Sequence, residues 1–138
     1  AIRDAAEAAE IAHRLHLPGF VANPKNYIGL FDIFALSSRS EQFPLSVVEA
    51  MAAGLPVAAP AVGDIAGMVA QENARFIVAP KDEAALGDAL LALAGDEDLR
   101  QNVGAANRAK ARAKFDEATM IASYRRLYDS ALGGGVLT

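Results

Sequence analysis

Two glutamates, Glu41 and Glu49, have a type and a spacing that could carry out chemistry. Between them the chain reads as the end of a polar loop and the start of a helix at Pro44, where the fixed φ and missing N–H of proline are tolerated. The free N–H groups near Leu45 and Ser46, together with the helix dipole, would form a site for a phosphate-type anion. Carboxylates that flank such an anion could accept hydrogen bonds from vicinal hydroxyls, as the acidic residue of dinucleotide folds does with ribose.

A plainer interpretation of this pair is a solvated loop residue followed by a partly exposed helix residue, because two glutamates eight positions apart are common. The surroundings of Glu49 favour a site, since its helix is apolar nearly all round and we expect its side chain to be buried. A buried carboxylate is costly unless a polar group satisfies it. Arg39, in the same loop, could contact a phosphate, but we expect a salt bridge between Arg39 and Glu41 instead.

The elements that must position this loop alternate between short apolar strands and helices. We expect strands at residues 14–17, 31–36, 57–59 and 75–78, and helices at residues 1–12, 25–30, 44–53, 82–94, 97–114 and 116–132. Gly54, followed by Leu55 and Pro56, predicts a C-terminal cap for the helix that carries Glu49. Asp64 predicts a cap for a further helix that starts after the third strand.

This alternation predicts an α/β fold, a Rossmann-like parallel sheet with helices on both faces and right-handed crossovers. Ligands of such sheets bind beyond the carboxyl ends of the strands, where the loops 37–43 and 60–63 lie. We expect the first one or two strand–helix units to be missing, and a neighbouring chain or a further segment to cover the unpaired edge. Residues 1–132 are assigned to one domain and residues 133–138, with three glycines, to a flexible tail.

Composition narrows the class of partner. The chain has 138 residues, a net charge of −4 and no cysteine. The acidic balance argues against nucleic acid as a partner, and the lack of cysteine excludes disulfides and thiolate metal sites and suits the cytoplasm. No apolar run reaches the ~18 residues of a membrane span. The basic residues between 108 and 114 could touch anionic lipid, but a solvated helix face is the expected role.

The glutamate motif and its surroundings resemble a known family. Residues 38–57, SRSEQFPLSVVEAMAAGLPV, resemble the signature of family 4 glycosyltransferases, the group-1 type with the GT-B fold. The resemblance to the family pattern extends to residues 19–21, 32–38, 78–80, 86–93 and 124–128. The resemblance implies that the chain is the C-terminal, nucleotide-sugar-binding half of a GT-B fold, and that an N-terminal acceptor domain precedes it.

The resemblance also implies a role for each residue of the motif. Glu41 would contact hydroxyls of the donor sugar and is the catalytic candidate, and Glu49 would bind the ribose hydroxyls. Backbone amides near residues 43–46 would hold the diphosphate. The implied donor-binding set is Glu41, Gln42, Phe43, Pro44, Leu45, Ser46 and Glu49.

The implied reaction is transfer of a hexosyl group from a nucleotide diphosphate sugar to an unidentified acceptor, with retention at the anomeric carbon and without a metal or a cofactor. The expectation of no metal fits a chain in which His13 and His16 lack an obvious third ligand. In the family, the cationic residues that neutralise the diphosphate lie upstream of this segment. We therefore expect the fragment alone to be inactive.

Two alternatives stay open, and two departures from the family pattern support the second of them. Gln42 stands where glycine is usual, and residues 63–67 match the family's Gly-Gly-x-x-Glu only at the first glycine, so the acid near Gly67 is lacking. One alternative is a GT-B epimerase that acts on the nucleotide sugar itself. The other is a degenerate, non-catalytic binding or assembly module.

Overall fold

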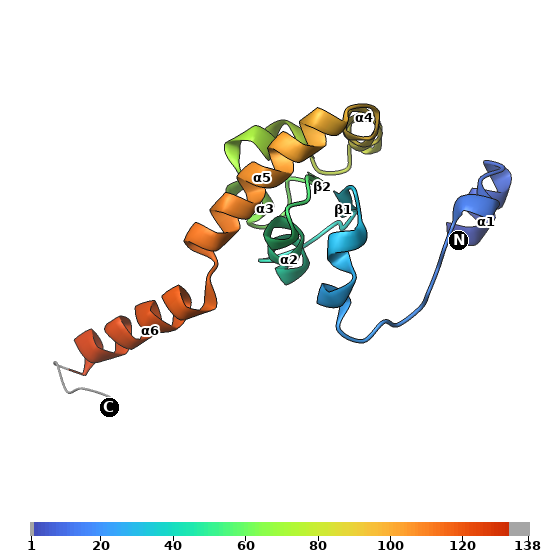
Figure 1. The fold of residues 1–138 in the computed structure, drawn as a ribbon. Helices are drawn as coiled ribbons and strands as arrows, with labels where there is room; N and C mark the ends of the chain where they lie inside the picture. Colours follow the sequence, from blue (N-terminus) through green and yellow to red (C-terminus); the bar gives the residue numbers. More distant parts are fainter. Residues whose placement is uncertain (1, 133–138) are drawn as a thin grey trace.

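The structure is a computed structural model that describes residues 2–132, so the tail assigned to residues 133–138 lies outside the described residues. The α-helices are α1 (Ile2–Ala8), α2 (Leu45–Ala53), α3 (Ile65–Met68), α4 (Glu83–Gly95), α5 (Glu97–Lys114) and α6 (Glu117–Ala131) (Figure 1). The 3-10 turns are η1 (Ala12–Arg14), η2 (Pro24–Asn26), η3 (Ile28–Leu30) and η4 (Gln71–Phe76). The strands are β1 (Phe34–Ala35), β2 (Val57–Pro60) and β3 (Ile77–Val78).

The three strands form a parallel sheet with β2 in the middle. Phe34 lies opposite Val57, and Ala59 lies opposite Ile77. Every residue of β2 is buried, as expected for a parallel strand that is covered on both faces. The predicted α/β fold with a parallel sheet is therefore confirmed.

Helices cover both faces of the sheet, because side chains alternate along β2. Val57 and Ala59 join a core cluster with apolar residues of α2 and α3. Ala58 belongs to a second cluster, with apolar residues of α4. The long helix α5 contributes to both clusters, with Ala111 in the first and Val103 in the second. The sheet, α2 and α5 thus share one packed core, and the loops beyond the strands extend from it.

Two buried asparagines hold the N-terminal end of β2. Asn73 and Asn107 are both 0% exposed. The side chain of Asn73 accepts a hydrogen bond from the N–H of Val57 and donates to its carbonyl, both at 2.8 Å. Asn107 donates to the carbonyl of Leu55 at 2.9 Å and to Asn73 Oδ1 at 2.8 Å, and accepts from the N–H of Ala70 at 3.0 Å. The sequence alone does not predict this network.

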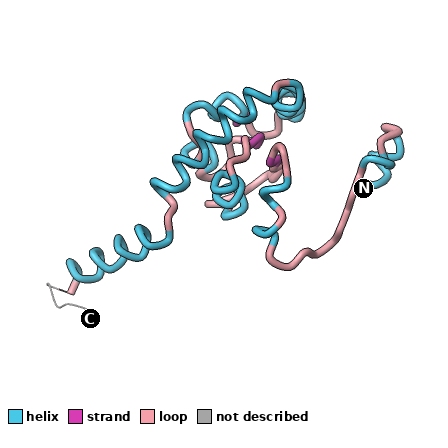
Figure 2. Tube along the Cα trace, viewed as in Figure 1, coloured by secondary structure: helices cyan, strands magenta, loops and turns pink. Residues whose placement is uncertain are grey.

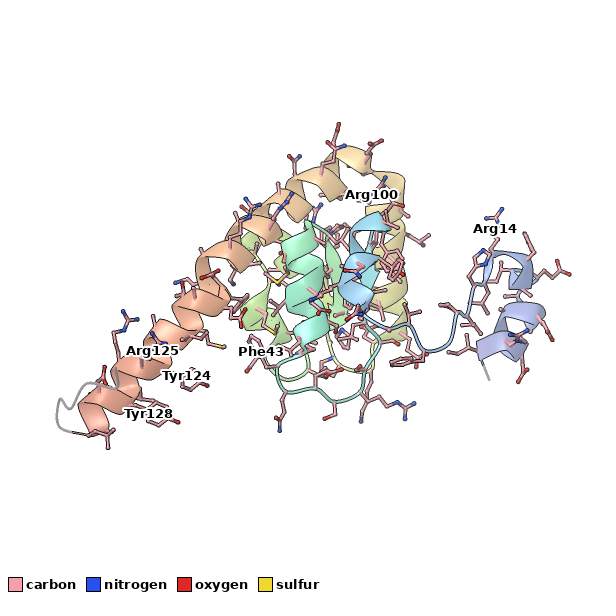
Figure 3. All side chains as sticks on the ribbon, turned by 60° about the horizontal axis from the view of Figure 1, so that its bottom comes forward. Arg14, Phe43, Arg100, Tyr124, Arg125 and Tyr128 are labelled. Carbon is pink, nitrogen blue, oxygen red and sulfur yellow. The ribbon has the colours of Figure 1, made fainter. Side chains whose placement is uncertain are left out.

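The helices α1 and α6 lie at the two ends of the molecule, away from the sheet (Figure 1). Residues 15–23 run as an extended loop between η1 and η2 (Figure 2). No residue of α6 is buried, although the helix is amphipathic. Its exposed apolar residues include Met120, Ile121, Tyr124, Leu127 and Tyr128, and Tyr124 and Tyr128 project from the same side (Figure 3).

Several predicted elements differ from the observed ones. The strand predicted at residues 14–17 is wrong: Ala12–Arg14 forms a 3-10 turn and residues 15–20 have no regular structure. A strand needs a partner, and within residues 2–132 β1 already forms the edge of the sheet. The helix predicted to reach residue 12 ends at Ala8, and Glu10 adopts a left-handed φ of 58°. Residues 71–76 form η4, which shortens the last predicted strand to β3.

The predictions that rest on local signals hold more closely. Gly54 ends α2 in the left-handed conformation, with φ 85°, and its N–H donates to carbonyls of that helix. The helix predicted at residues 97–114 has the observed bounds of α5. Asp64 does stand at the N-cap position of α3, but its side chain makes no capping hydrogen bond. The cap predicted for Asp64 is therefore wrong.

Candidate functional site

The candidate site lies where the chain leaves β1 and enters α2. The N–H of Leu36 donates to the carbonyl of Ala58 at 3.0 Å, which carries the pairing of β1 with β2 one residue beyond the strand. Residues 37–43 then form a loop at the carboxyl end of the sheet, the position at which parallel sheets bind ligands. Pro44 is buried and extended, with φ −71° and ψ 110°, and the helix begins at Leu45.

The N-terminus of α2 has no cap from a side chain. The N–H of Val47 donates to the carbonyl of Pro44 at 3.0 Å, so the first turn closes there. Leu45 and Ser46 precede that bond, and their N–H groups have no partner among residues 2–132. Unpaired N–H groups and the positive end of the helix dipole make this helix start suitable for an anion.

The two glutamates lie on either side of this helix start in the sequence, and both are partly exposed. The expectation that Glu49 is buried is wrong. Val47, Ala50 and Met51 form the buried face of α2, and at about 100° per residue Glu49 points away from that face. In the described part of the chain, neither the side chain of Glu41 nor that of Glu49 has a hydrogen bond or an ion pair. Both carboxylates are therefore available to a ligand.

The loop between Glu41 and the helix is fixed by two contacts. The ring of Phe43 packs edge-on against Phe115, with centroids 5.6 Å apart and an interplanar angle of 77°. Phe43 lies at the end of α2 that faces the loop (Figure 3), and Phe115 follows the last residue of α5. The carbonyl of Gln42 accepts a hydrogen bond from the N–H of Asp64 at 2.8 Å. Phe115 could not be predicted from local sequence, because its partner Phe43 lies more than seventy positions away.

The remaining members of the predicted set also lie at this helix start. Gln42, Phe43 and Leu45 are exposed, and Ser46 is partly exposed. The side chain of Leu45 is 70% exposed and makes no part of the core. Its contribution to a site would come from its backbone N–H, which is the role implied for residues 43–46.

Arg39 does not form the expected salt bridge with Glu41, as no ion pair joins these two described residues. It lines instead an open cavity of about 520 Å³ beyond the carboxyl ends of all three strands. Lys81, on the loop after β3, lines the same cavity and has a left-handed φ of 66°. The sequence signal for Lys81 is its place between Pro80 and Asp82, directly after a strand.

A second, smaller cavity of about 350 Å³ adjoins the Phe43–Phe115 contact. Gly63, Asp64 and Gly67 contribute to its lining. Gly67 stands near the position of the acid that the family pattern would supply. Asp64 also lines this cavity, three positions before Gly67, and its side chain has no partner in the part of the chain that the structure describes.

The other groups that could bind a partner give no second site in the described residues. Lys110, in the basic segment of α5, donates to the carbonyls of Gly67 and Val69, both at 2.7 Å, so it secures the end of α3. No group of three or more His, Cys, Asp or Glu side chains that could hold a metal ion occurs within residues 2–132. In the same range, no helix is both long and apolar enough to cross a membrane.

Comparisons with known proteins cover most of the chain. The family model described as glycosyl transferases group 1 matches residues 1–110. The chain is 26% identical over 122 residues to the N-acetyl-alpha-D-glucosaminyl L-malate synthase of Bacillus anthracis, with 88% of this chain and 32% of that protein covered. It is 38% identical over 104 residues to the N,N'-diacetylbacillosaminyl-diphospho-undecaprenol alpha-1,3-N-acetylgalactosaminyltransferase of Campylobacter jejuni, with 73% of this chain and 27% of that protein covered.

Among solved structures, the chain is similar to the sucrose-phosphate synthase from Thermosynechococcus elongatus, with a TM-score of 0.86 and 25% identity. The match covers 97% of this chain and 34% of that one. The parallel sheet with helices on both faces therefore defines the chain as an α/β domain of the Rossmann-like, GT-B type. Within that class, the chain belongs to the glycosyl transferases group 1 family. It spans about a third of the length of these relatives, 32% and 34% for the first protein and the solved structure.

Proposed function

We propose that this chain binds the nucleotide diphosphate sugar donor of a retaining, metal-independent glycosyl transfer. The observation that carries the proposal is the N-terminus of α2, which is uncapped by any side chain and has a glutamate without a protein partner on each side in the sequence. This helix start lies at the carboxyl end of a parallel sheet, where ligands of such folds bind. Membership of the group 1 family supports the same function.

The proposal gives separate roles to the parts of the site. The N–H groups of Leu45 and Ser46 hold the diphosphate, because they are unpaired and point along the positive end of the helix. Glu49 accepts hydrogen bonds from the ribose hydroxyls, and Glu41 accepts them from hydroxyls of the transferred sugar. A carboxylate suits both tasks, since it has two oxygens that only accept hydrogen bonds.

In the proposed reaction, the bond between the anomeric carbon and the phosphate oxygen breaks, and a bond to an acceptor hydroxyl oxygen forms on the same face of the sugar. The acceptor proton leaves with the departing nucleotide diphosphate. Negative charge grows on that leaving group in the transition state, and the N-terminus of α2 stabilises it because its N–H groups are already oriented. This chain contributes the donor side, and the acceptor is bound by a further domain, a role that the chain's coverage of only 32% and 34% of two longer relatives supports.

The experiment that tests the proposal is calorimetric titration of the protein expressed from its complete gene with UDP, GDP and ADP. At least one of them should bind, and Glu49→Gln should weaken it by about tenfold or more, since the substitution removes a charged hydrogen-bond acceptor. Glu72→Gln is a matched control, because Glu72 is exposed on η4, far from α2 in sequence. Absence of binding by all three nucleotides would contradict the proposal.

A non-catalytic binding module is the second candidate, and two residues favour it. Gln42 replaces the usual glycine beside Glu41, and Gly67 occupies the region of the missing acid. Such a module would bind the nucleotide sugar but neither transfer nor hydrolyse it. Incubation of the complete protein with the nucleotide sugar that it binds, followed by chromatography of the products, separates the two functions.

A further inference from the structure

Gly63 lies where two loops of the candidate site approach each other most closely. Its φ is +55°, in the left-handed region that favours glycine. A Cβ atom at this position would lie 2.5 Å from the carbonyl oxygen of Glu41, and closer still to that of Gln42. Both neighbours are backbone atoms, so a side chain could be accommodated only by moving the loop that carries Glu41.

The next residue joins the same two loops by a hydrogen bond. The N–H of Asp64 donates to the carbonyl of Gln42 at 2.8 Å. The loop after β2 therefore both supports residues 41–42 sterically and binds them. The loop that carries Glu41 is also held at its other end, where the ring of Phe43 packs against Phe115. Residues 41–42 thus lie between two fixed points.

The side chain of Glu41 has no partner of its own within residues 2–132. Its direction is therefore set by the backbone that carries it and not by a hydrogen bond or an ion pair. The backbone of residues 41–42 packs directly against Gly63. A shift of the loop would move the Glu41 carboxylate relative to the N-terminus of α2, whereas Glu49, within the helix, would stay in place.

We infer that Gly63 is a positioning residue for recognition of the donor sugar. Its missing side chain lets residues 41–42 rest on the loop after β2, and this contact holds Glu41 at the sugar end of the site. The inference rests on the proposed function and goes beyond it, because it assigns to Gly63 a contribution to the sugar and not to the nucleotide.

Two other glycines, Gly54 and Gly87, serve as controls for the general effects of replacing glycine with alanine. Gly54 also has a positive φ, +85°, but the atoms nearest to an added Cβ lie at 3.7 and 3.9 Å. Alanine at Gly54 would therefore add backbone strain without a collision. Gly87, within α4, has no atom within 4 Å of an added Cβ and no positive φ, so alanine there should be harmless.

The test compares Gly63→Ala with Gly54→Ala and Gly87→Ala in the protein expressed from its complete gene. For each variant, calorimetry measures the affinities for a nucleotide diphosphate and for the corresponding nucleotide sugar, and kinetics measures kcat/KM. Gly63→Ala should lower kcat/KM by about 100-fold, the scale of an ångström-sized misplacement, and shift the ratio of the two affinities against the sugar. Gly54→Ala should lower only the thermal midpoint, and Gly87→Ala should resemble the wild type.

A double-mutant cycle shows whether Gly63 acts through Glu41. In a Glu41→Ala background, Gly63→Ala should cause no further change in the affinity ratio, because the carboxylate that it positions is already gone. If the two substitutions changed the affinity ratio additively, the inference would be overturned. An affinity ratio in Gly63→Ala equal to that of the wild type would overturn it as well. If wild-type protein binds neither ligand, the proposed function fails and the inference fails with it.

Asp64→Pro provides a second variant in case Gly63→Ala does not fold. It removes the N–H that donates to the carbonyl of Gln42 and adds no side chain at position 63. The affinity ratio should shift in the same direction by about threefold, the scale of one hydrogen bond. An unchanged ratio in a folded Asp64→Pro protein would count against the positioning role.

Discussion

At the N-terminal end of β2, the side chains of Asn73 and Asn107 are wholly buried and form hydrogen bonds with each other and with the backbone of neighbouring residues. At the loops beyond the carboxyl ends of the strands, the N–H groups of Leu45 and Ser46 and the carboxylates of Glu41 and Glu49 lack partners among residues 2–132 and reach the surface. The sheet therefore has a closed end, where the buried asparagine side chains are hydrogen-bonded to the backbone, and an open end, where N–H groups and carboxylates have no protein partner among residues 2–132.

This difference predicts that substitutions at the closed end lower stability and that substitutions at the open end weaken ligand binding. A buried polar group that loses its partner costs its full desolvation penalty, so changes at the closed end should destabilise the fold. Exposed groups of the open end already have water as a partner. Changes there should leave the fold intact and affect ligands. Four substitutions test this division, and the largest expected effect comes first.

Asn107→Ala should lower the free energy of unfolding by about 3 kcal/mol, because it leaves the N–H of Ala70 and the carbonyl of Leu55 buried without their partner. Urea unfolding followed by circular dichroism measures the change. Asn102→Ala is the matched control, since Asn102 is an exposed asparagine of the same helix. Equal losses in the two variants would show that the buried network does not support β2.

Gly104→Ala should lower the free energy of unfolding by about 2 kcal/mol through overpacking. An added Cβ would collide with the carbonyl oxygen of Gly54 and lie 2.9 Å from its carbonyl carbon, where α5 crosses the end of α2. The same unfolding measurement on Gly95→Ala serves as control, because Gly95 has open space around it. A Gly104→Ala protein as stable as the wild type would mean that α2 and α5 can shift to accommodate the added methyl group at little cost.

Phe43→Ala should cost about 1 kcal/mol of stability, the contribution of an edge-on aromatic pair. This substitution sharpens the comparison, because Phe43 belongs to the open end and yet packs against another residue. Phe115→Ala should cause a similar loss, and the double variant should lose less than the sum of the two. Strict additivity in the unfolding data would argue that the rings do not interact.

Glu49→Gln should change the free energy of unfolding by less than about 0.5 kcal/mol, because Glu49 is partly exposed and has no partner within residues 2–132. Thermal and urea unfolding of the variant measure this smallest effect. A loss as large as that expected for Asn107→Ala would remove the distinction between the two ends of β2.

The sequence predicted the parts of the fold that depend on neighbouring residues. The helix expected at residues 97–114 has the bounds of α5, and its start is local in origin, because the side chain of Asp96 accepts a hydrogen bond from the N–H of Leu99 at 2.9 Å. Gly54 marked the end of α2 for a similar local reason. In contrast, the strand expected at residues 14–17 was wrong, because strand formation depends on a partner that local pattern does not reveal.

Contacts between distant residues were also missed. Asn107 reads as a surface residue by type, and its partner Asn73 lies 34 positions away. Its place four residues after Val103 and four before Ala111, which are both buried, was the signal that it faces the core. The members of the candidate site came from the motif and its family resemblance. The contact that positions Glu41 did not, because only folding brings Gly63 onto that loop.

The helix α6 has an intact hydrogen-bonded backbone and no buried side chain. Opening a helix of this kind exposes almost no new apolar surface, so its amides should exchange with deuterium by local fraying on their own timescale. The amides of β2, each buried, should exchange only when the sheet itself opens. Isotope labelling of the chain would then show two separate populations, a fast one from residues 117–131 and a slow one from the sheet.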